Sequence, residues 1–145
     1  MRFGHVNLVA RDWRTLADFY CRHLGCTLLA PERDLHGALV DAGVGVADAH
    51  IRGVHIRLPG YDENGPTLEI YRYDPLIDVA SSVRRSGFGH IAFQVDDIDV
   101  TRAAILAGGG SAIGDVVTTV AGTRHVSWCY VADPEGNAIE LQRWH

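Results

Sequence analysis

Residues 3–12 read FGHVNLVARD, and residues 88–97 read FGHIAFQVDD. Both stretches begin with Phe-Gly-His and continue with apolar residues at alternate positions, which is the pattern of a half-buried β-strand. Their alignment places His5 over His90. Both histidines have the opposite parity to the apolar residues, so we expect their side chains on the opposite face of each strand.

A second pair of related stretches follows in the same order. Residues 68–73 read LEIYRY and residues 139–144 read IELQRW, which aligns Glu69 with Glu140. Apolar residues flank each glutamate, so each carboxylate should lie on the face opposite to its apolar neighbours. Two matches in one order indicate an internal duplication.

The duplication predicts one domain of two modules, residues 1–74 and residues 87–145, joined by a linker at about residues 75–86. Each module should have the order strand, helix, strands. The chain of 145 residues, with 47% hydrophobic and 21% charged residues, has the composition of a globular protein. It is long enough to bury a hydrophobic core, and disorder and coiled coil are excluded.

One helix is predicted in each module. Trp13–Leu24 has apolar residues at helical spacing, Asp12 as its N-cap and a glycine directly after it. The matching helix, Val100–Ala107, follows two candidate N-caps, Asp97 and Asp99, and ends at three consecutive glycines.

The end of each module predicts a pair of antiparallel strands. Val126–Ala132 and Ala138–Trp144 flank the turn sequence DPEGN at residues 133–137. Val54–Leu58 and Thr67–Tyr73 are the counterparts in the first module.

The duplication singles out four residues that could hold a metal ion: His5, Glu69, His90 and Glu140. Each module supplies one imidazole and one carboxylate on the face away from its helix. Two neutral imidazoles and two carboxylates balance a divalent cation and leave one or two octahedral positions open. If the modules are related by approximate two-fold symmetry, the four side chains can converge on one divalent metal ion.

Charge and cysteine content restrict the partners and the compartment. With 13 basic and 18 acidic residues, the net charge is −5, so the chain lacks the electrostatic footprint of a nucleic-acid or polybasic membrane protein. No apolar run has the length of a signal peptide or a membrane span. The three cysteines are expected to be reduced thiols, and the protein is expected to be cytoplasmic.

The two repeats, the histidine near the start of each, the glutamate in the last strand of each, and the turn at residues 133–137 resemble the vicinal oxygen chelate superfamily. This superfamily includes glyoxalase I, extradiol dioxygenases and bleomycin resistance proteins. The resemblance implies an α+β fold in which two tandem βαβββ modules form an open, cupped mixed β-sheet with helices on the outer face. It also implies one divalent metal ion per site (Ni, Zn, Co, Mn or Fe) and a homodimer.

The ligand set of two histidines and two glutamates is similar to that of bacterial glyoxalase I. This resemblance implies a metal-dependent lyase or isomerase that acts on a small α-oxygenated carbonyl compound through an enediolate or enolate. By the same resemblance, Glu140 is the catalytic base, and Glu69 is the mirror-related candidate for a second base.

Further residues are expected to line the pocket. Simple pairing within each terminal strand pair places Trp128 and Tyr130 on the face of Glu140, and Arg57 with His55 on the face of Glu69. Arg57 could hold an anionic substrate group or lie on a solvated rim. The predicted substrate-binding residues are Arg57, Tyr71, Trp128 and Tyr130.

Two other functions stay open from the sequence. An extradiol-type ring-cleaving dioxygenase with Fe(II) or Mn(II) would use His5, His90 and Glu140 and leave Glu69 outside the shell. A non-catalytic antibiotic-binding resistance protein would use the aromatic side chains of the pocket. The Gly/Ala-rich segment Asp41–Ala49 is interpreted as a surface loop, or as a lid over the pocket.

Overall fold

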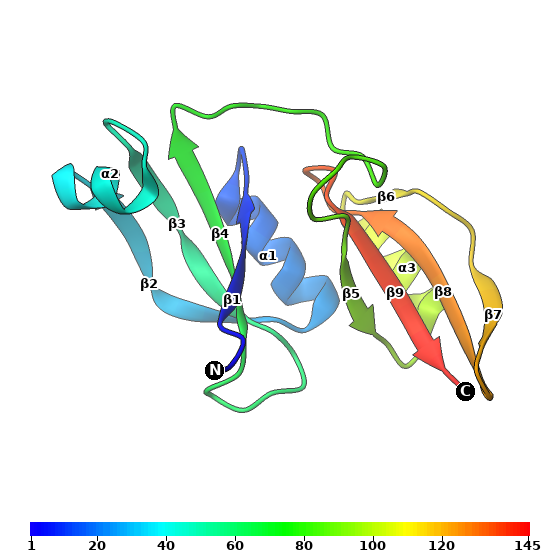
Figure 1. Cartoon of the computed structure of the whole chain (residues 1–145). Coiled ribbons are helices and arrows are strands. Elements are labelled where there is room, and N and C mark those ends of the chain that lie inside the picture. Colours follow the sequence, from blue (N-terminus) through cyan, green and yellow to red (C-terminus); the bar gives the residue numbers. More distant parts are fainter. The chain divides into compact units, whose positions relative to one another are not determined.

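The computed structural model describes all 145 residues, which form two compact units, Met1–Asp78 and Val79–His145 (Figure 1). Each unit has a mixed β-sheet with a helix packed against it. The predicted α+β class, built from two tandem modules, is confirmed.

The first unit contains a four-stranded sheet in the order β1-β4-β3-β2. Strand β1 runs parallel to β4, and the other neighbours are antiparallel. Its elements are β1 (His5–Val9), α1 (Trp13–Leu24), β2 (Thr27–His36), α2 (Ala38–Val44), β3 (His50–Arg57) and β4 (Thr67–Asp74).

The second unit repeats this plan. Its sheet has the order β5-β9-β8-β6, with β7 also paired to β8, and β5 runs parallel to β9. Its elements are β5 (Ile91–Gln94), α3 (Ile98–Ala107), β6 (Ser111–Ala112), β7 (Val117–Ala121), β8 (Arg124–Ala132) and β9 (Ala138–Trp144). The first strand of each unit therefore lies beside the last one.

Helix α1 has the predicted boundaries. The Asp12 carboxylate accepts a hydrogen bond from the Thr15 backbone N–H, and Gly25 ends the helix with a left-handed φ of 68°. Leu16, Phe19 and other buried residues form the face that packs against β3 and β4. Helical spacing and caps therefore agree with the packing.

Helix α3 begins at Ile98, two residues before the predicted start. Of the two candidate caps, Asp97 is the N-cap, and its carboxylate accepts from the Val100 backbone N–H. Buried Ile98 and Ile105 anchor the helix to the sheet of the second unit.

Each sheet buries its apolar face and leaves the other face to polar and aromatic residues. The residues facing each core alternate with those on the other face, as the strand patterns predict. Fully buried strand residues are Val54, Ile56, Leu68 and Ile70 in the first unit and Cys129, Val131, Ile139 and Leu141 in the second.

The turn between β8 and β9 is built around Asp133, which is only 2% exposed. Its carboxylate accepts hydrogen bonds from the backbone N–H groups of Glu135 and Asn137 and from the Asn137 side-chain amide. These bonds hold the predicted hairpin in the register that pairs Tyr130 with Glu140.

The first strand of each unit is shorter than its sequence pattern predicts. Phe3 and Phe88 are exposed, β1 starts at His5, and β5 starts at Ile91. The prediction that His90 lies within a strand was therefore wrong: it directly precedes β5. The residues before each strand do not pack against a core, so the alternation of apolar residues predicts both strands as too long.

The prediction of a loop or lid over residues 41–49 was wrong for its first residues, which form the end of α2. Gly45 ends this helix with a left-handed φ of 72°, and the Asp41 carboxylate accepts from the backbone N–H groups of Asp48 and Ala49. Helix α2 buries no residue, so its sequence lacks the apolar spacing that would have indicated a helix.

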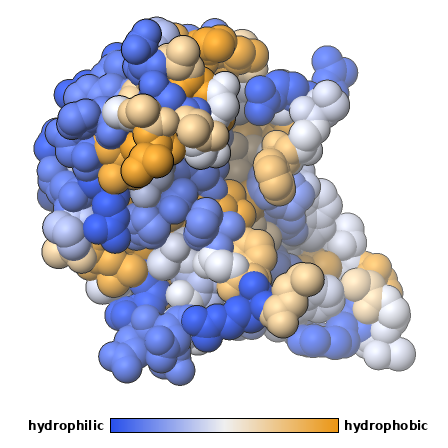
Figure 2. Space-filling model, turned by 60° about the vertical axis from the view of Figure 1, so that its left-hand side comes forward, coloured by the Kyte–Doolittle hydropathy of each residue, from blue (hydrophilic) through white to orange (hydrophobic).

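The surface view in Figure 2 shows apolar residues in separate patches among hydrophilic ones. None of the three helices combines the length and the apolar character needed to cross a membrane.

Candidate functional site

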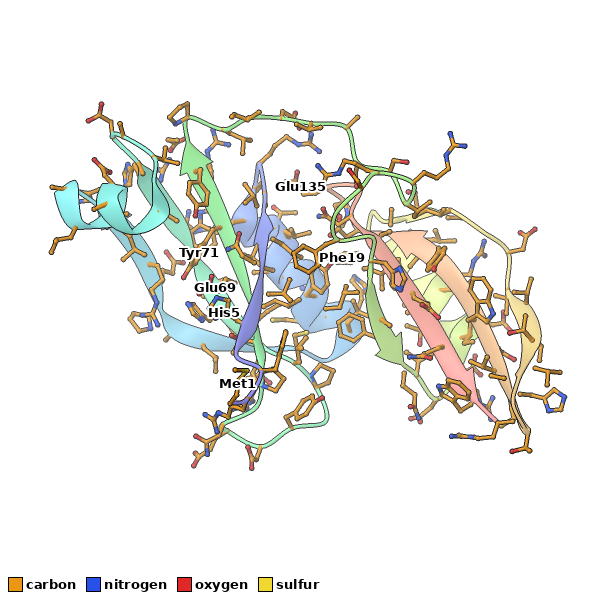
Figure 3. All side chains as sticks on the ribbon, in the orientation of Figure 1. Met1, His5, Phe19, Glu69, Tyr71 and Glu135 are labelled. Atoms are coloured by element: carbon orange, nitrogen blue, oxygen red, sulfur yellow. The ribbon has the colours of Figure 1, made fainter.

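The polar face of the first sheet gathers four side chains around Glu69, namely His5, Asn7, His55 and Tyr71, and we call these five residues the Glu69 cluster. His5 Nε2 lies 3.4 Å from Glu69 Oε2, and His55 Nε2 lies 3.3 Å from Glu69 Oε1. The Asn7 side-chain amide donates to Glu69 Oε2 at 3.4 Å. Figure 3 shows His5, Glu69 and Tyr71 on neighbouring strands β1 and β4.

Strand register explains why these residues meet. Asn7 on β1 pairs with Glu69 on β4, and Glu69 pairs with His55 on β3. The three residues thus form one row across three strands, with their side chains on one face. His5 and Tyr71 lie two residues along the same face from this row.

Tyr71 contacts the same nitrogen of His55 that faces Glu69. Its hydroxyl lies 2.7 Å from His55 Nε2. Gly53 pairs with Tyr71, and a Cβ at Gly53 would meet the Tyr71 ring at 2.3 Å, so this close approach requires glycine. Burial, with the nearby negative charge of Glu69, raises the pKa of the Tyr71 hydroxyl.

His55 is held in an environment that favours a neutral imidazole. Burial lowers its pKa, and this outweighs the opposing effect of the Glu69 carboxylate. A neutral imidazole with its proton on Nε2 can donate to either of the two oxygen atoms that face it.

The second sheet holds the corresponding Glu140 cluster: His90, Trp128, Tyr130, Glu140 and Gln142. His90 Nε2 lies 3.0 Å from Glu140 Oε2, and the Glu140 side chain is 20% exposed. Tyr130 pairs with Glu140, and its ring centroid lies 5.0 Å from that of His90. Burial, with the negative charge of Glu140, raises the pKa of the Tyr130 hydroxyl.

The next pair of residues on this face of the second sheet consists of an aromatic and an amide side chain. Trp128 pairs with Gln142, and its ring lies 5.6 Å from that of Tyr130. The Trp128 indole N–H donates to the Thr119 hydroxyl at 3.1 Å, which fixes the ring. The prediction that Trp128 and Tyr130 share the face of Glu140 is confirmed by this register.

Arg57 also lies on its predicted face. It pairs with Thr67, two residues along the β3–β4 strand pair from His55 and Glu69, and it is partly exposed. It forms no ion pair with Glu69. Its role toward an anionic substrate group stays a prediction.

The donor chemistry of the two clusters fits a divalent cation. Each cluster presents an imidazole Nε2 against a carboxylate Oε2, and no arginine forms an ion pair with Glu69 or Glu140. Imidazole and carboxylate suit Zn, Ni, Co, Mn and Fe(II). No three His, Cys, Asp or Glu side chains are arranged to hold a metal ion within either unit. Each unit by itself therefore offers one half of the predicted ligand set.

Sequence reasoning placed His55 on the face of Glu69 but gave it no role, and it missed the contact of Asn7 with Glu69. The signal that could have found both residues is the strand register. Counting the β3–β4 pairing outward from its turn places His55 directly opposite Glu69.

A family model described as "Glyoxalase/Bleomycin resistance protein/Dioxygenase superfamily" matches residues 2–141. A Vibrio cholerae protein named "Probable lactoylglutathione lyase" is 28% identical over 141 residues, covering 97% of this chain and 88% of that protein. A Vibrio parahaemolyticus protein of the same name is 45% identical over 56 residues, covering 39% of each chain.

Solved structures show the same fold. A glyoxalase family protein from Bacillus cereus superposes with a TM-score of 0.82 at 20% identity, covering 99% of this chain and 94% of that one. A glyoxylase/bleomycin resistance protein/dioxygenase domain from Frankia has a TM-score of 0.63 at 19% identity, covering 100% and 93%.

Proposed function

The chain belongs to the glyoxalase/bleomycin resistance protein/dioxygenase superfamily, and we propose that it is a metal-dependent lyase or isomerase of the glyoxalase type. Its substrate is a small α-oxygenated carbonyl compound. The observation that carries the proposal is the pair of His–Glu contacts at equivalent positions of the two units, His5 with Glu69 at 3.4 Å and His90 with Glu140 at 3.0 Å.

The proposed metal ligands are His5, Glu69, His90 and Glu140. A complete ligand shell combines one His5–Glu69 pair with one His90–Glu140 pair and holds one divalent ion. When bound, the metal would act as a Lewis acid that polarises the substrate carbonyl and stabilises the developing oxyanion.

Glu140 is the proposed base. Its carboxylate takes the proton from the carbon next to the substrate carbonyl, which leaves an enediolate or enolate, and returns the proton to the neighbouring carbon. Glu140 is 20% exposed and its contact is with His90, so the carboxylate is accessible to a substrate. Glu69 is the mirror-related second candidate.

The proposed substrate-binding side chains differ between the units. Trp128 and Tyr130 present aromatic surface beside Glu140 and would exclude water from the reacting carbon. Tyr71 and Arg57 lie on the face of Glu69, where the guanidinium would hold an anionic substrate group.

Elemental analysis of protein purified without chelator or histidine tag tests the ligand set. Wild type should contain about one divalent ion per His5–Glu69–His90–Glu140 set. Glu69→Ala and Glu140→Ala should each lose it, because a carboxylate ligand is removed. The matched control is Glu63→Ala, which removes an exposed carboxylate of the first unit.

The same variants separate this proposal from its rivals. Iron retained in Glu69→Ala, with oxygen uptake on catechols, would replace the proposal with a ring-cleaving dioxygenase. Absence of metal in reconstituted wild type, with tight binding of an aromatic antibiotic, would replace it with a binding protein.

A mixing experiment identifies the chains that contribute to one shell. The two pairs of one shell could come from two chains of a homodimer. In that case, a mixed dimer of Glu69→Ala and Glu140→Ala subunits has one shell with both pairs intact, and this shell binds metal again. If both pairs come from one chain, the mixture stays metal-free.

A further inference from the structure

The structure assigns His55 as a positioning residue that holds Glu69 in place, so that Glu69 stays a fixed metal ligand while Glu140 is free to act as the base. This inference rests on the proposed function and deepens it by making the two glutamates inequivalent. Its evidence lies in the neighbours of the two carboxylates within their own units.

The two units can be compared residue by residue through their strand registers. Glu69 on β4 corresponds to Glu140 on β9. The residue paired with each glutamate on the antiparallel neighbour is His55 in the first unit and Tyr130 in the second. On the parallel neighbour, the amide of Asn7 corresponds to the methyl group of Ala92.

Both oxygens of Glu69 have partners. His55 Nε2 lies 3.3 Å from Oε1, while His5 Nε2 and the Asn7 amide each lie 3.4 Å from Oε2. His5 and the Asn7 amide contact one oxygen and His55 the other, so the carboxylate is restrained against rotation about its terminal bond. The Glu69 side chain is 15% exposed.

His55 is itself held in place by Tyr71. The Tyr71 hydroxyl lies 2.7 Å from His55 Nε2, and Gly53 leaves the space that the Tyr71 ring occupies. Nε2 of the imidazole thus faces both the Tyr71 hydroxyl and Glu69 Oε1, and the contact with Tyr71 fixes the imidazole beside the carboxylate.

Glu140 lacks this restraint. His90 contacts Oε2 at 3.0 Å, and no hydrogen bond joins Glu140 to Tyr130, the equivalent of His55. Tyr130 instead packs its ring near that of His90. Oε1 of Glu140 therefore has no protein partner.

The difference has a chemical consequence. A ligating carboxylate that is held by a neighbouring side chain keeps its orientation, and loss of such an outer partner commonly weakens metal binding by about 10- to 100-fold. A carboxylate that must reach a carbon-bound proton needs the opposite property, freedom to move. Glu69 and Glu140 occupy equivalent positions of the duplication, but only Glu69 has His55 beside it, and this difference gives the two glutamates different roles.

Double-mutant cycles on Co²⁺ affinity test the assignment. His55→Ala should raise the Co²⁺ dissociation constant about 10- to 100-fold in wild type and in the Glu140→Gln background, but by less than about threefold in the Glu69→Gln background. The matched control is Tyr130→Phe at the equivalent position, which should change the constant by less than about threefold. His55→Tyr, which copies the second unit, serves if His55→Ala fails to fold.

An effect of His55→Ala that is equal in both glutamine backgrounds would overturn the assignment, because a general structural loss does not distinguish the glutamates. An unchanged dissociation constant would overturn it as well.

A metal-free readout keeps this inference separate from the proposed function. In crystals of the metal-free protein, the Glu69 carboxylate should be better ordered than that of Glu140, and His55→Ala should remove the difference. If wild type binds no Co²⁺ but this ordering is seen, the proposed function fails while the positioning by His55 stands. Equal order of Glu69 in wild type and His55→Ala would overturn the positioning.

Discussion

Glu69 and Glu140 illustrate how much a single neighbour changes a residue. Both are flanked by apolar residues in the sequence, and both contact a histidine near the start of their unit. They differ in the side chain directly across the strand pair, which is His55 for one and Tyr130 for the other. At the residue scale, function therefore depends on a cross-strand partner that sequence spacing alone does not reveal.

Glu140→Gln should lower kcat by at least 100-fold and change KM by no more than a few fold. Glutamine keeps the shape and one ligand oxygen but cannot take a proton, and proton transfer by a positioned side chain is commonly worth about 10²- to 10⁴-fold. Steady-state kinetics with an isomerase and lyase substrate panel, together with metal content, measures this. Full activity with metal retained would reject Glu140 as the base.

Asp12→Ala should destabilise the protein by about 1 kcal/mol at neutral pH, the usual cost of losing an N-cap. Hydrogen bonds from the Thr15 side chain and backbone lower the pKa of the Asp12 carboxyl below 3.8. A lowered pKa stabilises the fold above pH 3.8, and this contribution is lost as pH falls through the lowered value. The difference from wild type should therefore shrink in acid.

Urea unfolding of wild type and Asp12→Ala across this pH range gives the comparison. Asp99→Ala is the control, because Asp99 lies in the first turn of α3 without capping it. A difference that stays constant down to pH 2 would contradict the assigned role of the Asp12 charge.

At the scale of elements, the sequence predicted the helix that buries an apolar face and did not predict the helix that buries no residue. Helix α1 combines an apolar stripe with a cap at each end, and its predicted boundaries are confirmed. Helix α2 buries no side chain, so only the folded chain reveals it. Strands β1 and β5 are shorter than predicted because Phe3 and Phe88 continue the alternation without reaching a core.

Gly53→Ala should displace Tyr71 and disturb the contact between Tyr71 and His55. An added Cβ would lie 2.1 Å from the Ile70 carbonyl oxygen and 2.3 Å from the Tyr71 ring, so the strands must shift. Overpacking of this kind costs about 1–3 kcal/mol. Thermal and urea unfolding measure the loss.

The control for this change is Gly43→Ala. Gly43 lies in α2, and nothing lies within 4 Å of an added Cβ. Because alanine favours a helix over glycine, this variant should be as stable as wild type or slightly more stable. Equal stability of both alanine variants would show that Gly53 is not required for the close approach of Tyr71.

At the scale of the whole molecule, each unit has its own buried core and its own His–Glu pair. The proposed shell needs both pairs, so metal should stabilise both units together. Ligand binding to the native state adds about 2.7 kcal/mol of stability at 100 times the dissociation constant.

Hydrogen exchange with and without Co²⁺ gives a direct measurement. Protection should increase in β4 around Glu69 and in β9 around Glu140, and Glu140→Ala should remove the increase in both strands. Protection confined to one strand in wild type would contradict a shell that uses both pairs. Glu63→Ala, in an exposed part of the first unit, should retain both increases.

The sequence by itself determined the duplication, the α+β class, helix α1, the two terminal strand pairs, and the pairing of a histidine with a glutamate in each unit. These features follow from local periodicity and from self-similarity, which need no knowledge of packing. The tertiary structure alone decided that His55 and Asn7 contact Glu69 while Glu140 has no such partners. The reason is register: side-chain neighbours across a sheet depend on how strands distant in sequence align, and a slip of one residue would turn every side chain to the other face.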